Sequence, residues 1–407
     1  MRVLLTTYAF PDNRQAFMEE YVLALLALGI EVCVVASAGR DPAPKLRKDC
    51  GGSSLEVVHA SWADPRRKKL VTLLTTMGRA ARHHPAELRK LVVALHRRHG
   101  FGRALLGRLY VLTPILSQRV DVVHLGWLTA ASEWPDLLLA VDAPIVVSCH
   151  GSDLRIDPLR GDRYRKSLAT VFERADLVHC VSDDLARHAI AFGLEPSKVF
   201  VRAWGVDTAF FRPAREREMH APVLRVVSVG RLHWVKGYEF ALQALAQVRR
   251  AGVEIEYTII GNGDEKELLV MLATVRDLDL ESHVRIRGEL SRNEVVEALQ
   301  VADVFLLSSL SEGLSTATLE AMAVGLPVVV TDVGGMCEAV TDGVEGRVVA
   351  PRDPAALAGA LLELAADAQL RATMGECGRR RATEGFDTES VARAMIEQYQ
   401  RLVRERT

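Results

Sequence analysis

Short apolar runs of strand length alternate along this chain with stretches whose apolar residues recur every three or four positions. The first run, 2–7, is followed by a helical pattern with Phe17, Tyr21 and Leu25 on one face, and Gly29 ends that pattern. The same alternation recurs to the end of the chain. It predicts strands at 2–7, 31–36, 55–59, 121–125, 145–149, 177–181, 199–202, 224–229, 256–260, 284–287, 303–307, 328–331 and 346–349.

Two successive series of this kind predict an α/β protein with two doubly wound parallel sheets and right-handed crossovers. A polar, proline-containing stretch at 212–223 separates the series. We therefore expect an N-terminal domain at 1–205, a linker at 206–222 and a second domain at 223–385. A terminal helix is expected at 386–407, with its apolar stripe formed by Val391, Met395, Tyr399 and Leu402.

The segment 66–108 is basic and amphipathic. Glu87 is its one acidic residue among twelve lysines and arginines, and leucines recur at helical spacing. The pattern predicts two or three basic amphipathic helices. Three interpretations stay open: contact with an anionic membrane, contact with a phosphate-bearing acceptor, or a solvated helical insertion.

Overall composition excludes several classes of protein. The 407 residues carry a net charge of −1, so nothing draws the whole chain to nucleic acid. The six cysteines are scattered without a C-x-x-C pair, which fits a reducing cytoplasm. The apolar start is too short for a signal peptide, and no run reaches the roughly 18 apolar residues of a membrane helix. We expect a cytoplasmic protein, with peripheral contact at the inner face of the plasma membrane as the alternative.

The turn after the strand at 303–307 has the features of an anion site. Ser315 and Thr316 are suited to cap a helix that Gly325 ends, and Gly313 lets a ligand approach the backbone. A helix N-terminus offers unpaired N–H groups and the positive end of its dipole. This turn also carries Glu312.

Glu312 and Glu320 admit three interpretations. A glycosidase pair needs roughly 5–9.5 Å between carboxyl groups. Eight helical residues would instead separate them by about 12 Å. Two separate contacts to hydroxyl groups of one ligand fit the spacing better, and two ordinary surface glutamates fit it as well.

Two further turns follow apolar strands. Gly230 ends the strand at 224–229, and Arg231 and Lys236 come next; such a cation pair can clamp a diphosphate or simply be solvated. His150 and Asp153 follow the strand at 145–149, at the end of the sheet where ligands bind.

Neither a metal nor a dinucleotide is indicated. Asp277 and Asp279 form a D-x-D sequence, but it lies in a helical, charged run. No G-x-G-x-x-G follows the first strand, so NAD is not implied. We expect no metal and no cofactor.

Taken together, the turns resemble the retaining glycosyltransferases of family 4, which have the GT-B architecture. Motifs in matching order cover most of the chain, and His150–Asp153 matches the H-G-[ST]-D element of that family. The segment 204–213 resembles its domain-junction motif. The other matching residues are Gly230, Arg231, Lys236, Gly237, Gly261, Gly263, Glu312, Gly313, Glu320, Ala321, Gly325, Pro327, Val328, Gly334 and Gly335.

The resemblance implies two Rossmann-like domains facing a cleft, a terminal helix that crosses back to the first domain, and a role for each matching residue. Arg231 and Lys236 would bind the diphosphate of a UDP- or GDP-linked sugar. Glu320 would bind the ribose, and Glu312 the donor sugar. His150 would lie beside that sugar. Gly313, Leu314, Ser315 and Thr316 would contact the distal phosphate. Gly288 and Leu290 would contact the base.

The chain departs from the family at two places. The Gly-Gly loop after the first strand is replaced by residues 11–14, and Arg14 is a plausible substitute at the acceptor side together with Asp153. Trp204 stands where asparagine is usual. The first departure resembles a branch associated with bacterial exopolysaccharide and colanic-acid assembly.

The implied activity is metal-independent transfer of a hexose, with retention, to a glycan, lipid-linked or small-molecule acceptor. Such transfer would serve polysaccharide, glycolipid or secondary-metabolite glycoside assembly. The alternatives are a sugar-nucleotide epimerase or a phosphorylase on the same scaffold, or a non-catalytic subunit of a polysaccharide complex.

Overall fold

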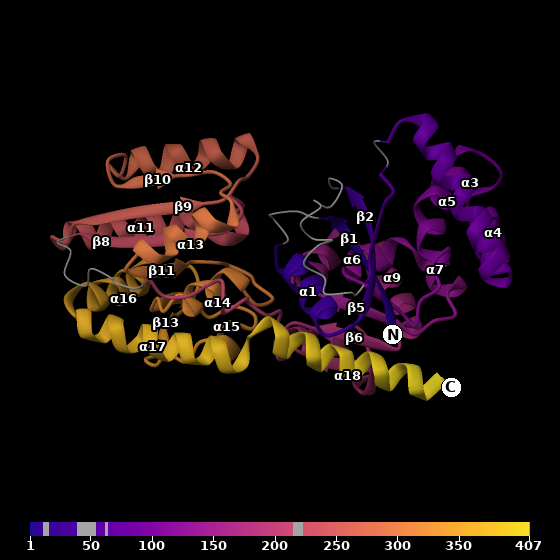
Figure 1. Cartoon of the computed structure of the whole chain (residues 1–407). Coiled ribbons are helices and arrows are strands. Elements are labelled where there is room, and N and C mark those ends of the chain that lie inside the picture. The colour runs from indigo at the N-terminus through magenta and orange to yellow at the C-terminus, as the bar shows by residue number, and fades with distance from the viewer. Residues whose placement is uncertain (11–15, 39–53, 62–63, 215–222, 407) are drawn as a thin grey trace. The chain divides into compact units, whose positions relative to one another are not determined.

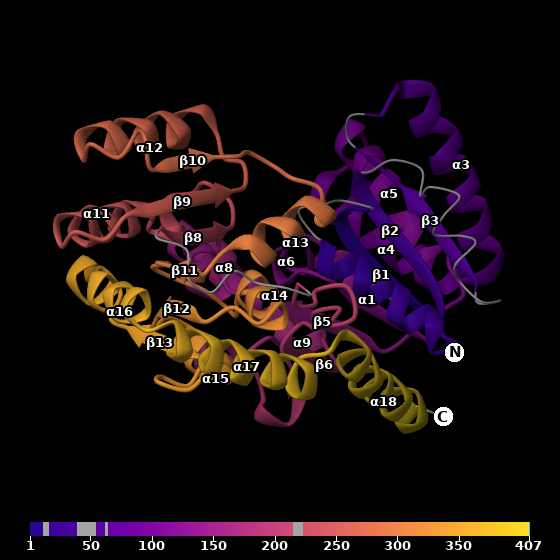
Figure 2. The same cartoon turned by 60° about the vertical axis from the view of Figure 1, so that its left-hand side comes forward.

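The computed structural model describes residues 1–10, 16–38, 54–61, 64–214 and 223–406 (Figure 1). The chain forms two compact units. Unit 1 comprises Met1–Arg202 and Val391–Thr407, and unit 2 comprises Ala203–Ser390. Figure 2 shows the same elements from a second direction.

The described part of unit 1 contains a parallel sheet of seven strands in the order β3-β2-β1-β4-β5-β6-β7. The chain moves outward from β1 to β3 and then returns to place β4 beside β1. The strand order therefore reverses between β1 and β4. The strands are β1 (Arg2–Ala9), β2 (Glu31–Ala38), β3 (Leu55–His59), β4 (Val122–Leu125), β5 (Ile145–Cys149), β6 (Leu177–Cys180) and β7 (Val199–Val201).

Helices cover the sheet of unit 1, which explains why its central strands are buried on both faces and mostly apolar. All residues of β4, β5 and β6 are buried. The basic segment folds as three helices, α3–α5, as its pattern predicted. The helices are α1 (Ala16–Ala27), α3 (Arg66–His83), α4 (Pro85–His99), α5 (Arg103–Leu116), α6 (Leu128–Glu133), α7 (Pro135–Ala140), α8 (Ser152–Arg155), α9 (Asp162–Arg174) and α10 (Asp183–Ala191).

The terminal helix α18 (Thr388–Arg406) joins unit 1 from Val391 onward, through a buried chain of hydrogen bonds. Tyr399 on α18 contacts the hydroxyl of Tyr21 at 2.8 Å and Nδ1 of His124 at 2.6 Å. Ser148 then lies between Nε2 of His124 (2.7 Å) and Nδ1 of His179 (2.8 Å). Nε2 of His179 meets the carbonyl of Arg202 at 2.6 Å.

Because a carbonyl can only accept, this last contact fixes the proton positions along the whole chain. His179 donates from Nε2, so its Nδ1 accepts from Ser148, and Ser148 in turn accepts from His124. Tyr399 must then donate to His124. Both imidazoles are neutral, and burial lowers the pKa of His124 well below its usual value and that of His179 to about 3.

These pKa values make the stability of unit 1 depend on pH. A histidine whose pKa is lowered in the folded state takes up a proton only on unfolding as the pH falls below about 6.5. We expect the free energy of unfolding to be highest above that pH and to fall below it, by up to about 1.4 kcal/mol per pH unit for each histidine. Urea unfolding between neutral pH and the onset of acid unfolding measures this slope. His179→Gln should flatten this slope.

The described part of unit 2 contains a second parallel sheet, with six strands in the order β10-β9-β8-β11-β12-β13. Here the strand order reverses between β8 and β11. All thirteen predicted strands are confirmed, with ends that shift by no more than two residues. The strands of unit 2 are β8 (Leu224–Val229), β9 (Ile255–Ile260), β10 (Val284–Ile286), β11 (Val304–Leu307), β12 (Val328–Thr331) and β13 (Gly346–Val349).

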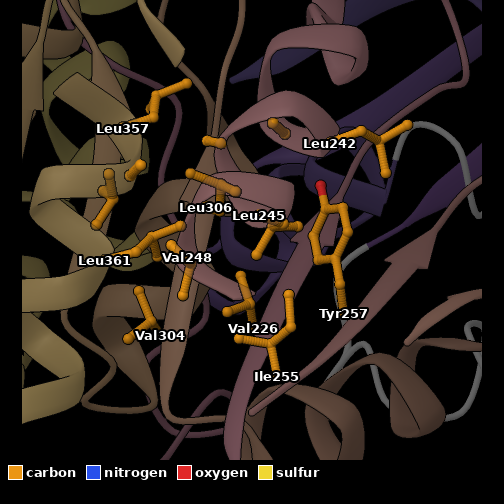
Figure 3. Packing of buried hydrophobic residues seen from close by; sticks show 14 of the residues in the cluster. Val226, Leu242, Leu245, Val248, Ile255, Tyr257, Val304, Leu306, Leu357 and Leu361 are labelled. Carbon is orange, nitrogen blue, oxygen red and sulfur yellow. The ribbon is translucent and has the colours of Figure 1, made fainter. Parts of the chain in front are cut away.

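Apolar clusters cover both faces of this second sheet. In Figure 3, Leu242, Leu245 and Val248 of one helix pack against strand residues such as Val226 and Tyr257. The hydroxyl of Tyr257 is paired with Ser228 at 2.7 Å, so this buried tyrosine leaves no polar group unsatisfied. The helices of unit 2 are α11 (Tyr238–Arg250), α12 (Glu265–Asp277), α13 (Arg292–Val301), α14 (Thr316–Ala323), α15 (Met336–Ala339), α16 (Pro354–Ala366) and α17 (Ala368–Gly385).

Candidate functional site

Two turns meet at the carboxyl edge of the unit 2 sheet. One follows β8 and runs from Gly230 to Gly237, and the other follows β11 and runs from Ser308 to Ser315. Strands β8 and β11 are neighbours, and the strand order reverses between them. In open parallel sheets this is the position where a ligand binds.

Backbone contacts join the two turns. The Leu310 amide donates to the Val235 carbonyl at 2.7 Å, and the Ser308 hydroxyl donates to the Lys236 carbonyl at 3.0 Å. Gly237 has φ +58°, and a Cβ there would lie 2.3 Å from the Ser308 carbonyl oxygen. Only glycine fits this approach, which sets the Lys236 side chain against the second turn.

The two turns bring Lys236 and Glu312 together as an ion pair. Lys236 Nζ donates to Glu312 Oε1 at 2.7 Å, and the Ser309 hydroxyl donates to the same oxygen at 2.6 Å. The two charged side chains are 18% and 12% exposed. Glu312 Oε2 receives no hydrogen bond from the part of the chain that the structure describes. One oxygen is therefore held by the protein, and the other can accept from a ligand.

The N-terminus of α14 lies directly beyond this pair. Ser315 caps the helix by accepting from the Thr318 amide at 3.3 Å, as the sequence predicted. The turn after β12 packs beneath it: the Gly335 amide donates to the Gly313 carbonyl at 2.8 Å. Gly334, with φ +61°, approaches Glu312 so closely that a Cβ would lie 2.0 Å from its carbonyl oxygen. Three turns thus fix the backbone from Glu312 to Thr316.

The other residues predicted to bind the sugar donor lie at the carboxyl edge of the unit 2 sheet or on α14. Arg231 is exposed and makes no ion pair with any described residue. Gly288 follows β10 with φ +67°, and its carbonyl accepts from the Gly261 amide at 2.8 Å. Leu290 packs against the apolar cluster beneath α14, and Glu320 is partly buried on α14 itself.

The spacing of about 12 Å expected between Glu312 and Glu320 does not apply, because it assumed eight helical residues. The helix begins only at Thr316, so Glu312 lies in the preceding turn. The two carboxylates still belong to different elements.

A second cluster lies in unit 1, around His150. Its Nε2 donates to the Gly126 carbonyl at 2.7 Å, and its ring stacks on Trp127 with centroids 4.8 Å apart. Burial lowers the pKa of His150, so the imidazole is neutral. Asp153 is buried and accepts from the backbone amides of His150 (3.0 Å) and Gly151 (2.9 Å). Asp153 therefore fixes the turn that carries His150.

Sequence reasoning missed Ser309 and Trp127. Each follows a predicted strand by only two residues, and that position was the available signal. Tyr8, at the end of β1, also packs edge-on against Trp127 at 5.7 Å. Arg14, predicted at the acceptor side, lies outside the described residues.

Two features are absent from the residues that the structure describes. No three His, Cys, Asp or Glu side chains gather as they would around a metal ion. None of the described helices has both the length and the apolar character needed to span a bilayer.

Two doubly wound parallel α/β units, each with candidate site residues at the carboxyl edge of its sheet, are the architecture of the GT-B fold. The protein HepE from Anabaena, solved in complex with UDP-glucose, has the same fold. The two chains align with a TM-score of 0.72 at 18% identity, over 98% of this chain and 99% of that one.

Sequence comparison gives the family. Residues 15–210 match Glycosyltransferase Family 4, and residues 216–381 match Glycosyl transferases group 1. The D-inositol 3-phosphate glycosyltransferase of Kineococcus radiotolerans is 30% identical over 74% of this chain and 76% of its own length. The putative colanic acid biosynthesis glycosyltransferase WcaL of Salmonella typhimurium is 29% identical over 89% of this chain and 90% of its own length. The chain belongs to glycosyltransferase family 4.

Proposed function

We propose that this glycosyltransferase moves a sugar from a nucleotide diphosphate sugar to an acceptor hydroxyl, with retention of configuration and without a metal ion. The observation that carries the proposal is the Lys236–Glu312 pair, held between two turns at the switch point of the unit 2 sheet. The pair offers a cation and a carboxylate oxygen to a ligand, and the adjacent N-terminus of α14 offers backbone N–H groups to the same ligand.

The span of the edge fits a nucleotide sugar. Strands β10 and β11 are three steps apart in the sheet, which corresponds to about 14 Å. A base beside Gly288 and Leu290 and a sugar beside Glu312 would use this length, with the diphosphate between them near Arg231 and Lys236. HepE was solved with UDP-glucose, which supports a UDP-linked donor, and a GDP-linked one fits the same description.

Cations and backbone amides can neutralise the departing diphosphate without a metal. Lys236 is already in place, Arg231 is exposed beside it, and α14 supplies N–H groups. The D-x-D sequence lies elsewhere: Asp277 ends α12, a helix that begins at the carboxyl edge of the sheet and runs to the opposite edge. Asp277 is also exposed and pairs with Arg276.

The likeness to WcaL supports an acceptor in polysaccharide assembly, and the likeness to the inositol phosphate enzyme supports a phosphate-bearing acceptor. A phosphate-bearing acceptor is anionic. We propose that the basic segment 66–108 contacts such an anionic partner.

The test is incubation with UDP- and GDP-linked hexoses, with the products followed by NMR. We expect release of the nucleoside diphosphate that depends on an acceptor, and a product with the donor's anomeric configuration. Conversion of the donor to its epimer without an acceptor would indicate an epimerase. A reaction that depends on free phosphate would indicate a phosphorylase. Absence of turnover with every donor would favour a non-catalytic subunit.

The metal requirement is a separate arm of the same assay. We expect the transfer rate to be the same after EDTA treatment, because Lys236, Arg231 and the amides of α14 carry the phosphate charge. A loss of transfer that Mg²⁺ or Mn²⁺ restores would contradict metal independence.

A further inference from the structure

Helix α3 is apolar on two faces. Leu73, Thr76 and Ala80 are buried against the rest of unit 1. A second row, formed by Leu70, Val71 and Leu74, is 58%, 56% and 63% exposed. These three lie at i, i+1 and i+4, so they form one contiguous patch. The sequence pattern had not separated the two faces.

Cations lie at both ends of this exposed row. Arg67 precedes Leu70 and Val71 by three and four residues, and Arg82 lies two turns beyond Leu74. Both arginines are exposed, and neither has a carboxylate partner among the described residues. Between them, Gly78 and Ala81 add no charge and no bulk.

The neighbouring helix continues the basic surface. Arg89, Lys90 and Arg97 of α4 are exposed and make no ion pair within the described ranges. Three other cations of the segment are paired: Lys68 with Asp64 at 2.8 Å, Arg79 with Glu56 at 3.7 Å, and Arg98 with Asp136 at 3.5 Å. Figure 1 shows α3 and α4 at the outer edge of unit 1.

We propose that the exposed face of α3 docks on an anionic lipid bilayer, with Leu70, Val71 and Leu74 entering the interface and Arg67 and Arg82 contacting lipid phosphates. The inference rests on the proposal that segment 66–108 contacts an anionic partner, and it names that partner. An apolar row flanked by arginines is typical of helices that lie in the membrane interface.

The arginines and the apolar row of α3 together favour an anionic bilayer over other partners. A soluble phosphate-bearing acceptor would pair with the arginines but would leave the apolar row in water. A second copy of this chain would bring the same cations together, and like charges repel. An anionic bilayer satisfies both features at once.

The test is flotation of the full-length protein with vesicles of phosphatidylcholine alone or mixed with phosphatidylglycerol. We expect binding to the anionic vesicles only. The combined variant Leu70→Ser, Val71→Ser and Leu74→Ser should weaken binding at least about tenfold. Arg67→Gln with Arg82→Gln should weaken it about thirtyfold, and less at high salt.

Helix α12 offers matched controls. Leu269, Val270 and Leu272 are 59%, 56% and 47% exposed, so their change to serine removes similar exposed apolar area elsewhere. Arg250→Gln with Arg276→Gln removes two exposed arginines of unit 2. Both control variants should bind vesicles like the unaltered protein, and circular dichroism should show all variants folded.

Two results would overturn the proposal. One is that the unaltered protein does not bind the anionic vesicles, or that the serine variant binds them as tightly as the unaltered protein does. The other is binding of soluble polyphosphate as tight as that of vesicles, lost with the arginines but not with the apolar row. UDP binding by calorimetry is measured in parallel on the same variants and should stay unchanged. A failure of the bilayer proposal thus stays distinct from a failure of the proposed donor site.

Discussion

Replacing Lys236 by methionine is expected to abolish most transfer and to weaken binding of the nucleotide donor by about 1.5–3 kcal/mol, the range for a charged hydrogen bond. Methionine keeps the length of the lysine stem but not its charge. Turn 230–237 should keep its conformation, because backbone contacts with Leu310 and Ser308 hold it. Isothermal titration with UDP and initial rates of transfer measure the two effects.

The change also leaves Glu312 with Ser309 as its remaining partner, and this could itself disturb the site. Adding Glu312→Gln to the Lys236→Met protein removes the unpaired charge. If donor binding stays weak in the double variant, the lysine contacts the donor; recovery of full affinity would show that the defect came from the orphaned carboxylate.

Arg231→Ala is a second test of the predicted contacts to the donor diphosphate. Arg231 is exposed and has no ion pair in the described structure, so its loss should weaken donor binding without loss of stability. Lys266→Met and Arg250→Ala, at exposed positions of unit 2, are the matched controls. Unchanged affinity and turnover in both site variants would contradict the diphosphate role.

The fold could be predicted because most strands are short apolar runs bounded by turn residues. Val122–Leu125 and Val328–Thr331 are buried on both faces and largely apolar, as is typical of helix-covered parallel strands. Helix α14 was predicted with its cap because Ser315 satisfies backbone amides locally, through its own side chain.

Contacts between turns could not be predicted in the same way. The pairing of Lys236 with Glu312 joins residues 76 positions apart, and it depends on Gly237 and Gly334 letting backbones approach each other. Sequence spacing gives no distance across such turns. The second apolar face of α3 was missed for a related reason: Leu70, Leu73 and Leu74 all fit a helical period, and only burial separates them.

Glu312→Gln is expected to slow transfer about ten- to a hundredfold, without rescue by azide. In the structure Glu312 Oε1 accepts from both Lys236 and Ser309, which fixes the carboxylate and reduces its reactivity as a nucleophile. Glutamine keeps the shape, but its amide has one acceptor oxygen in place of two and no charge, so the hydroxyl contact and the ion pair both weaken. Rates with and without azide measure the effect, and Glu239→Gln on α11 is the control.

The absence of rescue follows from the proposed reaction course. Retention through a glycosyl-enzyme would need a carboxylate on the sugar face opposite the leaving group, and azide replaces such a carboxylate when it is removed. If Glu312 only binds a hydroxyl, the acceptor attacks from the face that the diphosphate leaves. A phosphate oxygen then takes the acceptor proton, while Lys236, Arg231 and the α14 amides stabilise the growing charge. A covalent adduct on Glu312 detected by mass spectrometry, or an inverted product by NMR, would contradict this course.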